Sequence, residues 1–159
     1  MKNSTPKHRK VLFLGREMGM LNPVAQQLRV DCPQIQVYLA STHYDGLQLL
    51  LSLSFDLFIP ELGTRPGTDL IELALKRQVP VLVILNGREP PGFRESLGSW
   101  KVRALSCQQD IQEVVRQIEK VLALQCLSRW RRLLGAMGKF PAWAIYKMSP
   151  GKPGNTWCN

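Results

Sequence analysis

The chain has 159 residues, of which 45% are hydrophobic and 21% are charged. This is enough apolar sequence to bury the core of one domain, which excludes a chain that is disordered throughout. No apolar stretch approaches the roughly 20 residues that span a bilayer. The basic N-terminus lacks the small-residue cleavage site of a signal peptide, so we expect a cytoplasmic protein.

The net charge of +9 is concentrated at the two ends of the chain. Residues 1–10 carry four basic side chains and no acid, and residues 116–159 carry eight basic side chains and one acid. Residues 11–115 hold nine basic and eleven acidic side chains, the balance of an ordinary domain. An anionic partner is therefore expected to meet the ends of the chain.

The sequence favours neither a metal centre nor a disulfide framework. Its cysteines lie far apart and form no C-x-x-C pair, at Cys32, Cys107, Cys126 and Cys158. The two histidines, His8 and His43, do not complete a zinc ligand set. We expect reduced, structural thiols and no bound metal.

Short apolar runs alternate with helical patterns in the first half of the chain. Strands are predicted at 10–14, 35–40 and 55–59, the last ended by Pro60. A helix capped by Asn22 should follow the first strand, and a helix capped by Asp45 should follow the second.

The alternation continues in the second half. A helix begins at Asp69, strands are predicted at 79–85 and 101–105, and residues 88–99 are weakly helical at best. A long helix begins at Asp110 and runs past Leu122. Five strands alternating with helices predict a doubly wound, five-stranded parallel sheet with helices on both faces, plus a basic C-terminal extension.

This pattern predicts four segments. We expect a basic tail, an α/β domain, a basic aromatic helical extension and a disordered tail, at residues 1–8, 9–125, 126–148 and 149–159. In an open α/β sheet a site lies at the carboxyl ends of the strands. The segment after the first strand is no glycine-rich phosphate loop, and no nucleophile has an adjacent base, so we expect neither an enzyme nor a cofactor.

The segment 37–85 resembles the centre of a response-regulator receiver domain. It shares the order strand, helix, a Phe-Asp-Leu opening to the third strand, a Pro/Gly loop, Asp-Leu-Ile-Glu-Leu, and Pro-Val leading into the fourth strand. The similarity extends more weakly over residues 9–125. It implies a CheY-like, flavodoxin-like fold and a role in two-component signal transduction or a phosphorelay.

The functional positions of the family are changed in this chain. The phosphoacceptor aspartate, five residues after Asp56, falls on Glu61. The acidic pair that helps to hold Mg²⁺ falls on Gly15 and Arg16, or on Arg16 and Glu17, so at most one acid remains.

The remaining pocket positions also differ. The Ser/Thr of the family falls on Leu85, next to Asn86, and its lysine and the following proline fall on Cys107 and Gln108. The resemblance therefore implies a degenerate, phosphorylation-independent receiver that acts through a protein partner. Its output surface would span residues 88–122.

Two of these residues allow alternative interpretations. Glu61 is either a solvated loop carboxylate or a constitutive phosphomimic that pairs with Arg16. Cys107 is either a core thiol at a strand end or a redox sensor, and the latter would need a cation or a helix N-terminus beside it. A third class of function, an enzyme with a remodelled pocket, would depend on the same residues.

Residues 11–29 also resemble the first strand, loop and helix of low-molecular-weight tyrosine phosphatases. In that family the nucleophilic cysteine falls on Gly15 and the loop arginine on Leu21. Phosphatase chemistry cannot run without thiolate and arginine, so we interpret this match as a shared fold signal.

The C-terminal extension alternates basic and aromatic side chains. These include Arg129, Trp130, Arg131, Arg132, Lys139, Trp143 and Lys147. Such a segment can bind single-stranded nucleic acid or lie on an anionic membrane. It can also dock on the domain or on a protein partner. The alternative function is therefore a nucleic-acid- or membrane-surface-binding adaptor.

Overall fold

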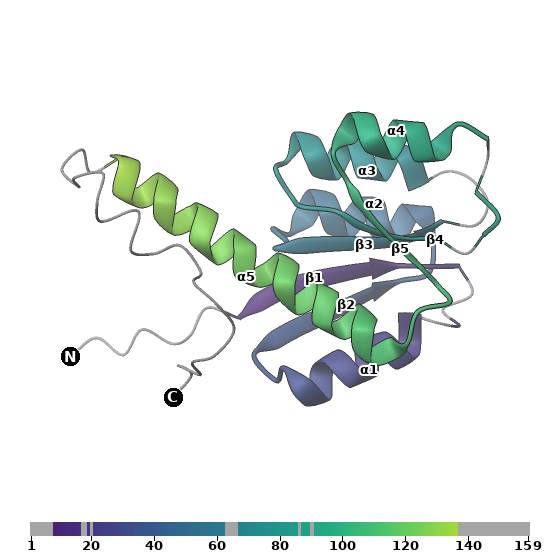
Figure 1. Cartoon of the computed structure of the whole chain (residues 1–159), viewed down its shortest axis with the longest axis horizontal. Coiled ribbons are helices and arrows are strands. Elements are labelled where there is room, and N and C mark those ends of the chain that lie inside the picture. Colours follow the sequence, from purple (N-terminus) through teal and green to yellow (C-terminus); the bar gives the residue numbers. More distant parts are fainter. Residues whose placement is uncertain are drawn as a thin grey trace. The chain divides into compact units, whose positions relative to one another are not determined.

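The computed structural model describes residues 8–16, 19, 21–62, 67–85, 87–89 and 91–136, without the side chains of 62, 67 and 126–136. The strands are β1 Arg9–Leu14, β2 Ile35–Ala40, β3 Leu57–Leu62, β4 Leu82–Leu85 and β5 Arg103–Ser106. The helices are α1 Leu21–Asp31, α2 His43–Ser52, α3 Gly67–Lys76, α4 Phe93–Trp100 and α5 Ile111–Ala136. The predicted alternation of strands and helices is confirmed (Figure 1).

The strands form one parallel sheet in the order β2-β1-β3-β4-β5. The chain starts near the middle, moves to one edge and then crosses to the other, so β2 and β5 are the edge strands. This is the predicted doubly wound sheet. All carboxyl ends lie on one edge, where a site is expected.

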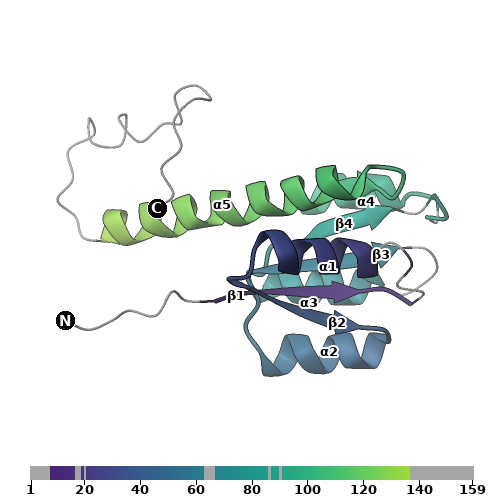
Figure 2. The same ribbon diagram turned by 90° about the horizontal axis from the view of Figure 1, so that it is seen from below.

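Helices cover both faces of the sheet, and each face has its own apolar core. The helix α1 and the first part of α5 lie on one face, and α2, α3 and α4 lie on the other (Figures 1 and 2). Val11 and Phe13 of β1 belong to the core on the α1 side, whereas Leu12 belongs to the core on the α2 side. All three side chains are fully buried. The continuous apolar run that predicted this strand therefore reflects burial on two faces.

The prediction that Pro60 ends the third strand was wrong. Pro60 pairs with Leu14 of β1, and the strand continues to Leu62. Because proline lacks an N–H, it interrupts the hydrogen-bond ladder between β3 and β4. Phe58 pairs with Val81 before the proline, and Glu61 pairs with Ile84 after it. The register is the same on both sides of the proline, so the strand survives.

The weak helical signal of residues 88–99 also misled the prediction, because this segment contains α4. Gly92 starts the helix in a left-handed conformation with φ 80°. Phe93 and Leu97 are buried, and the Trp100 ring lies edge-on to Phe93 at 6.4 Å. Tertiary packing thus supplies the stability that the local sequence lacks. The prediction that Asp45 caps the second helix was also wrong, because Thr42 caps α2 and Asp45 lies in its first turn.

The chain divides into two compact units, Met1–Leu122 and Ala123–Asn159, and α5 begins in the first and ends in the second. In the first unit, Arg9 Nη1 donates to the Leu122 carbonyl oxygen at 2.6 Å. None of the helices in the described ranges is both long enough and apolar enough to cross a membrane. The predicted tails at 1–8 and 149–159 lie almost wholly outside the described residues, and the segment boundaries stay predictions.

Candidate functional site

The carboxyl edge of the sheet brings the predicted residues of β1 and β3 into direct contact. Gly15 follows β1 and is buried, and its N–H donates to the Ala40 carbonyl oxygen at 3.1 Å. An ideal Cβ at Gly15 would lie 2.7 Å from Glu61 Oε2 and 2.5 Å from Leu21 Cδ1. The Glu61 carboxylate therefore packs against the main chain of Gly15, at a place where a Cβ would force the Leu21 and Glu61 side chains to shift.

Arg16, the next residue of the predicted pocket, is exposed. Glu17 and Asn86, which complete the two loops, lie outside the described residues. Of the three residues that could replace the acidic pair, Gly15 has no side chain, Arg16 is a cation, and Glu17 is an acid whose position is not described.

Two further residues of the predicted pocket, Leu85 and Cys107, lie where β4 and β5 end. Leu85 is paired with Ser106, and its carbonyl oxygen accepts from Cys107 N–H at 2.8 Å. Leu85 is buried, and the half-buried Cys107 packs against the core on the α1 and α5 side. In this arrangement Cys107 belongs to the core, and Leu85 presents no hydroxyl group.

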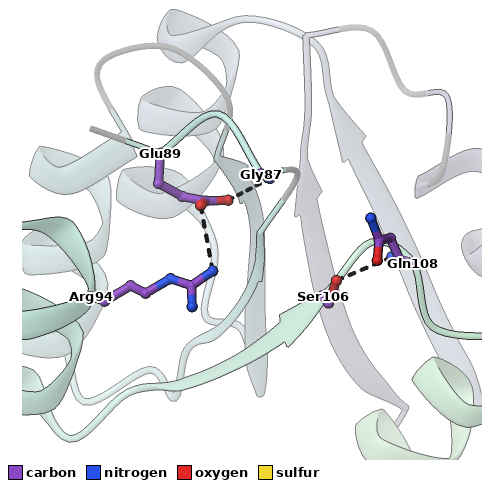
Figure 3. Close-up of polar contacts among 5 residues, drawn as sticks. All are labelled: Gly87, Glu89, Arg94, Ser106 and Gln108. Atoms are coloured by element: carbon purple, nitrogen blue, oxygen red, sulfur yellow. Dashed lines mark hydrogen bonds and ion pairs between the residues drawn. The ribbon is translucent and has the colours of Figure 1, made fainter. Parts of the chain in front are cut away.

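A glutamate of the β4–α4 loop, absent from the sequence prediction, also lies at this edge. The Glu89 side chain is only 7% exposed. Its Oε1 accepts from Gly87 N–H at 2.7 Å, and its Oε2 lies 3.9 Å from Arg94 Nη2 in the first turn of α4 (Figure 3). Gly87 has φ 83°, a conformation that favours glycine. Glu89 thus holds the loop and the start of α4 together.

A hydroxyl group organises the neighbouring β5–α5 loop. The Gln108 N–H donates to Ser106 Oγ at 3.3 Å (Figure 3). The Gln109 N–H donates to the Ser106 carbonyl oxygen at 3.2 Å. The pair is a local turn of the kind that serine favours. Ser106 is the last residue of β5, and the sequence predicted no role for it.

The described residues do not fit the divalent cation that the receiver fold implies. Gly15 offers no ligand, Arg16 is a cation, and Leu85 is apolar. Over the described ranges, no three His, Cys, Asp or Glu side chains lie close enough to hold a metal ion. Mg²⁺ takes several carboxylate and water oxygens in near-octahedral geometry, which this set does not supply.

The predicted residues of the extension cannot be assessed in the same way. Arg129, Trp130, Arg131 and Arg132 lie within α5, but their side chains are not described. Lys139, Trp143 and Lys147 lie outside the described residues altogether. Their role in anion binding stays a prediction.

No family model and no curated protein matches this chain. Solved structures match over the α/β domain. A response regulator receiver domain protein (CheY-like) from Methanospirillum hungatei JF-1 is 16% identical with a TM-score of 0.66, and the match covers 76% of this chain and 98% of that one. The signal receiver domain of an HD domain-containing protein from Pseudomonas fluorescens Pf-5 is 21% identical with a TM-score of 0.62, covering 74% and 97%.

A third match is an orphan response regulator of H. pylori, which is 16% identical with a TM-score of 0.60. This match covers 74% of this chain and 99% of that one. The likeness confirms the fold that the segment 37–85 predicted. The chain has the CheY-like, flavodoxin-like fold of response-regulator receiver domains. At these identities the likeness concerns the fold, and the function must be argued from the site.

Proposed function

We propose that the chain is a regulatory module of the receiver type that works without phosphorylation and without catalysis, by binding a protein partner in the cytoplasm. The observation that carries this proposal is the packing of Glu61 against Gly15. The position equivalent to the phosphoacceptor holds a glutamate, and a position equivalent to the acidic pair holds no side chain.

The chemistry of phosphoryl transfer supports this proposal. The transferred group needs a metal ion and cationic side chains, because charge develops on its oxygens in the transition state. Here Gly15 and Arg16, or Arg16 and Glu17, stand at the positions of the acidic pair, and Cys107 stands at that of the lysine. At most one acid of the pair and no lysine therefore remain at these positions, which supports a module that does not accept a phosphoryl group.

Glu61 also suggests how such a module could work without a phosphoryl group. A glutamate carries a charge of −1 where a phosphoaspartate would carry nearly −2. In our proposal this fixed charge, with the exposed Arg16 as its candidate partner, holds the module in one state. Regulation would then come from a partner with different affinities for two states.

The receiver resemblance implies an output surface on α4, β5 and the start of α5. In this structure Arg103 and Ala104 of the edge strand β5 are exposed, and Glu89 accepts a hydrogen bond from Gly87 N–H before α4. We propose that the protein partner binds this surface.

Partner capture from native lysate, compared between charge-reversal variants of the full chain, tests this proposal. Arg103→Glu should reduce recovery of the captured protein, because it reverses a charge on the output surface. Lys76→Glu reverses the charge of an exposed side chain on α3, outside the output surface, and should leave recovery unchanged. If recovery is equal with both variants, or is lost with Lys76→Glu alone, the partner does not bind the proposed output surface.

A further inference from the structure

We propose that the outer face of α2 is a self-association surface, on which a second copy of this chain packs with its own α2 antiparallel. Tyr44, Gln48 and Leu51 form the outer stripe at helical spacing, and the half-buried Leu47, which also packs on the core, lies beside them. Tyr44 is 66% exposed and Leu51 is 50% exposed. Positions i, i+3, i+4 and i+7 lie on one face of a helix and are the usual anchors of a helix contact.

Rotation of α2 about its own axis cannot bury the stripe, because the opposite face of the helix is already packed. On the inner face, Gly46 and Leu50 are buried against the sheet. An ideal Cβ at Gly46 would lie 3.2 Å from Leu14 Cδ1 and 3.2 Å from Leu70 Cδ1, so the helix is pressed against its neighbours. Tyr44 and Leu51 therefore stay exposed on a helix whose other face is already packed.

The charges around the stripe identify a second copy as the occupant. The stripe itself carries no charged side chain. Exposed Asp45 lies in the first turn of α2, and exposed Arg77 lies at the other end, with Nη1 3.3 Å from the Leu51 carbonyl oxygen. The face therefore has an acid at one end and a cation at the other.

A twofold axis that sets two α2 helices antiparallel makes this face complementary to itself. It brings the Asp45 end of each helix to the Arg77 end of the other, and opposite ends of the helix dipoles also meet. The same axis places Tyr44 against Leu51 of the second copy. Gln48 comes close to the axis, where its amide can both donate and accept.

Other occupants fit this face less well. A polyanion or an anionic membrane would meet Asp45 at one end and no cation on the stripe itself. The stripe covers about two turns of helix, so the contact is small, and we expect a weak, reversible dimer. This inference is independent of the proposed function, because α2 and the output surface are different parts of the domain.

Sedimentation velocity of the full chain over a range of concentrations tests the dimer. The wild type should show a monomer–dimer equilibrium. Leu51→Lys should raise the dissociation constant about tenfold or more, because it places a charge in an apolar contact. Val30→Lys is the matched control: Val30 is 76% exposed on α1, which packs on the opposite face of the sheet. A wild type that stays monomeric, or a Leu51→Lys dimer of unchanged affinity, would overturn the proposal.

Disulfide cross-linking tests the antiparallel register. Tyr44→Cys and Leu51→Cys proteins are oxidised separately and as a mixture, and the linked peptides are identified by mass spectrometry. We expect a disulfide between the two introduced thiols in the mixture only. Efficient linkage of either variant to itself through its introduced thiol, or no linkage between them in the mixture, would rule this register out.

Discussion

The contact between Gly15 and Glu61 determines the character of the site at the scale of single residues. The Glu61 carboxylate and the Leu21 side chain fill the space next to the Gly15 main chain. The sequence predicted that both Gly15 and Glu61 lie at the carboxyl edge, because each comes at or near the end of a strand. It could not predict that they touch, since that distance depends on the register of β1 against β3.

Gly15→Ala should destabilise the domain, because the new Cβ would overlap Leu21 Cδ1 and Glu61 Oε2. We expect a loss of about 1–3 kcal/mol, the usual cost of overpacking, measured by urea unfolding. Gly98→Ala is the matched control, since nothing lies within 4 Å of its Cβ position in α4. It should stabilise the chain by about 0.5–1 kcal/mol. Equal effects of the two changes would contradict the close packing.

Cys32 predicts a dependence of stability on alkaline pH. Burial, and then the hydrogen bond from its Sγ to Glu119 Oε1 at 2.8 Å, raise the pKa of the thiol from 9.0 to about 12. A raised pKa in the folded state favours the protonated form. The stability it contributes is therefore complete below pH 9.0 and is lost as the pH rises toward about 12.

Urea unfolding of the wild type and Cys32→Ala at several alkaline pH values measures this effect. The difference in free energy of unfolding between the two proteins should shrink as the pH rises. A constant difference would show that the Cys32 thiol does not titrate with a raised pKa. The same environment should leave Cys32 unreactive toward alkylating agents near neutral pH, because the thiolate is the nucleophile.

At the scale of elements, the β4–α4 loop depends on Glu89. Glu89→Ala would remove the acceptor of the exposed Gly87 N–H, and because water can take its place we expect a cost of about 0.5–1.5 kcal/mol. Arg94 is 74% exposed, so Arg94→Ala should cost less than about 1 kcal/mol. Hydrogen exchange should show faster exchange at Gly87 and in α4 for Glu89→Ala only. Unchanged exchange in both variants would contradict this role.

The elements also show where sequence patterns succeed and fail. Apolar runs predicted all five strands and four of the helices, because burial determines both the pattern and the fold. The α4 helix was missed, since Gly98 and two serines weaken its local preference and the packing of Phe93 supplies its stability. Glu89 gave no signal either, because its partners are a main-chain N–H and an arginine in another element.

At the scale of the whole molecule, the proposal assigns partner binding to the α/β domain. Reversing two charges of the extension, with Arg131→Glu and Arg132→Glu together, should leave capture of the protein partner unchanged, as should nuclease treatment. The adaptor alternative predicts the opposite result. Capture would then be lost with both treatments and would fall steeply with salt, because binding to a polyanion releases counterions.

The central claim is that this receiver-like domain works without phosphorylation, and intact-mass measurement of the full chain tests it most directly. The chain is incubated with acetyl phosphate and Mg²⁺, beside a receiver domain that has its acidic pair and phosphoacceptor. We predict that the control gains one phosphoryl group and that this chain gains none. A phosphoryl adduct on this chain that disappears with Glu61→Gln would contradict the account, because it would show that Glu61 accepts the group.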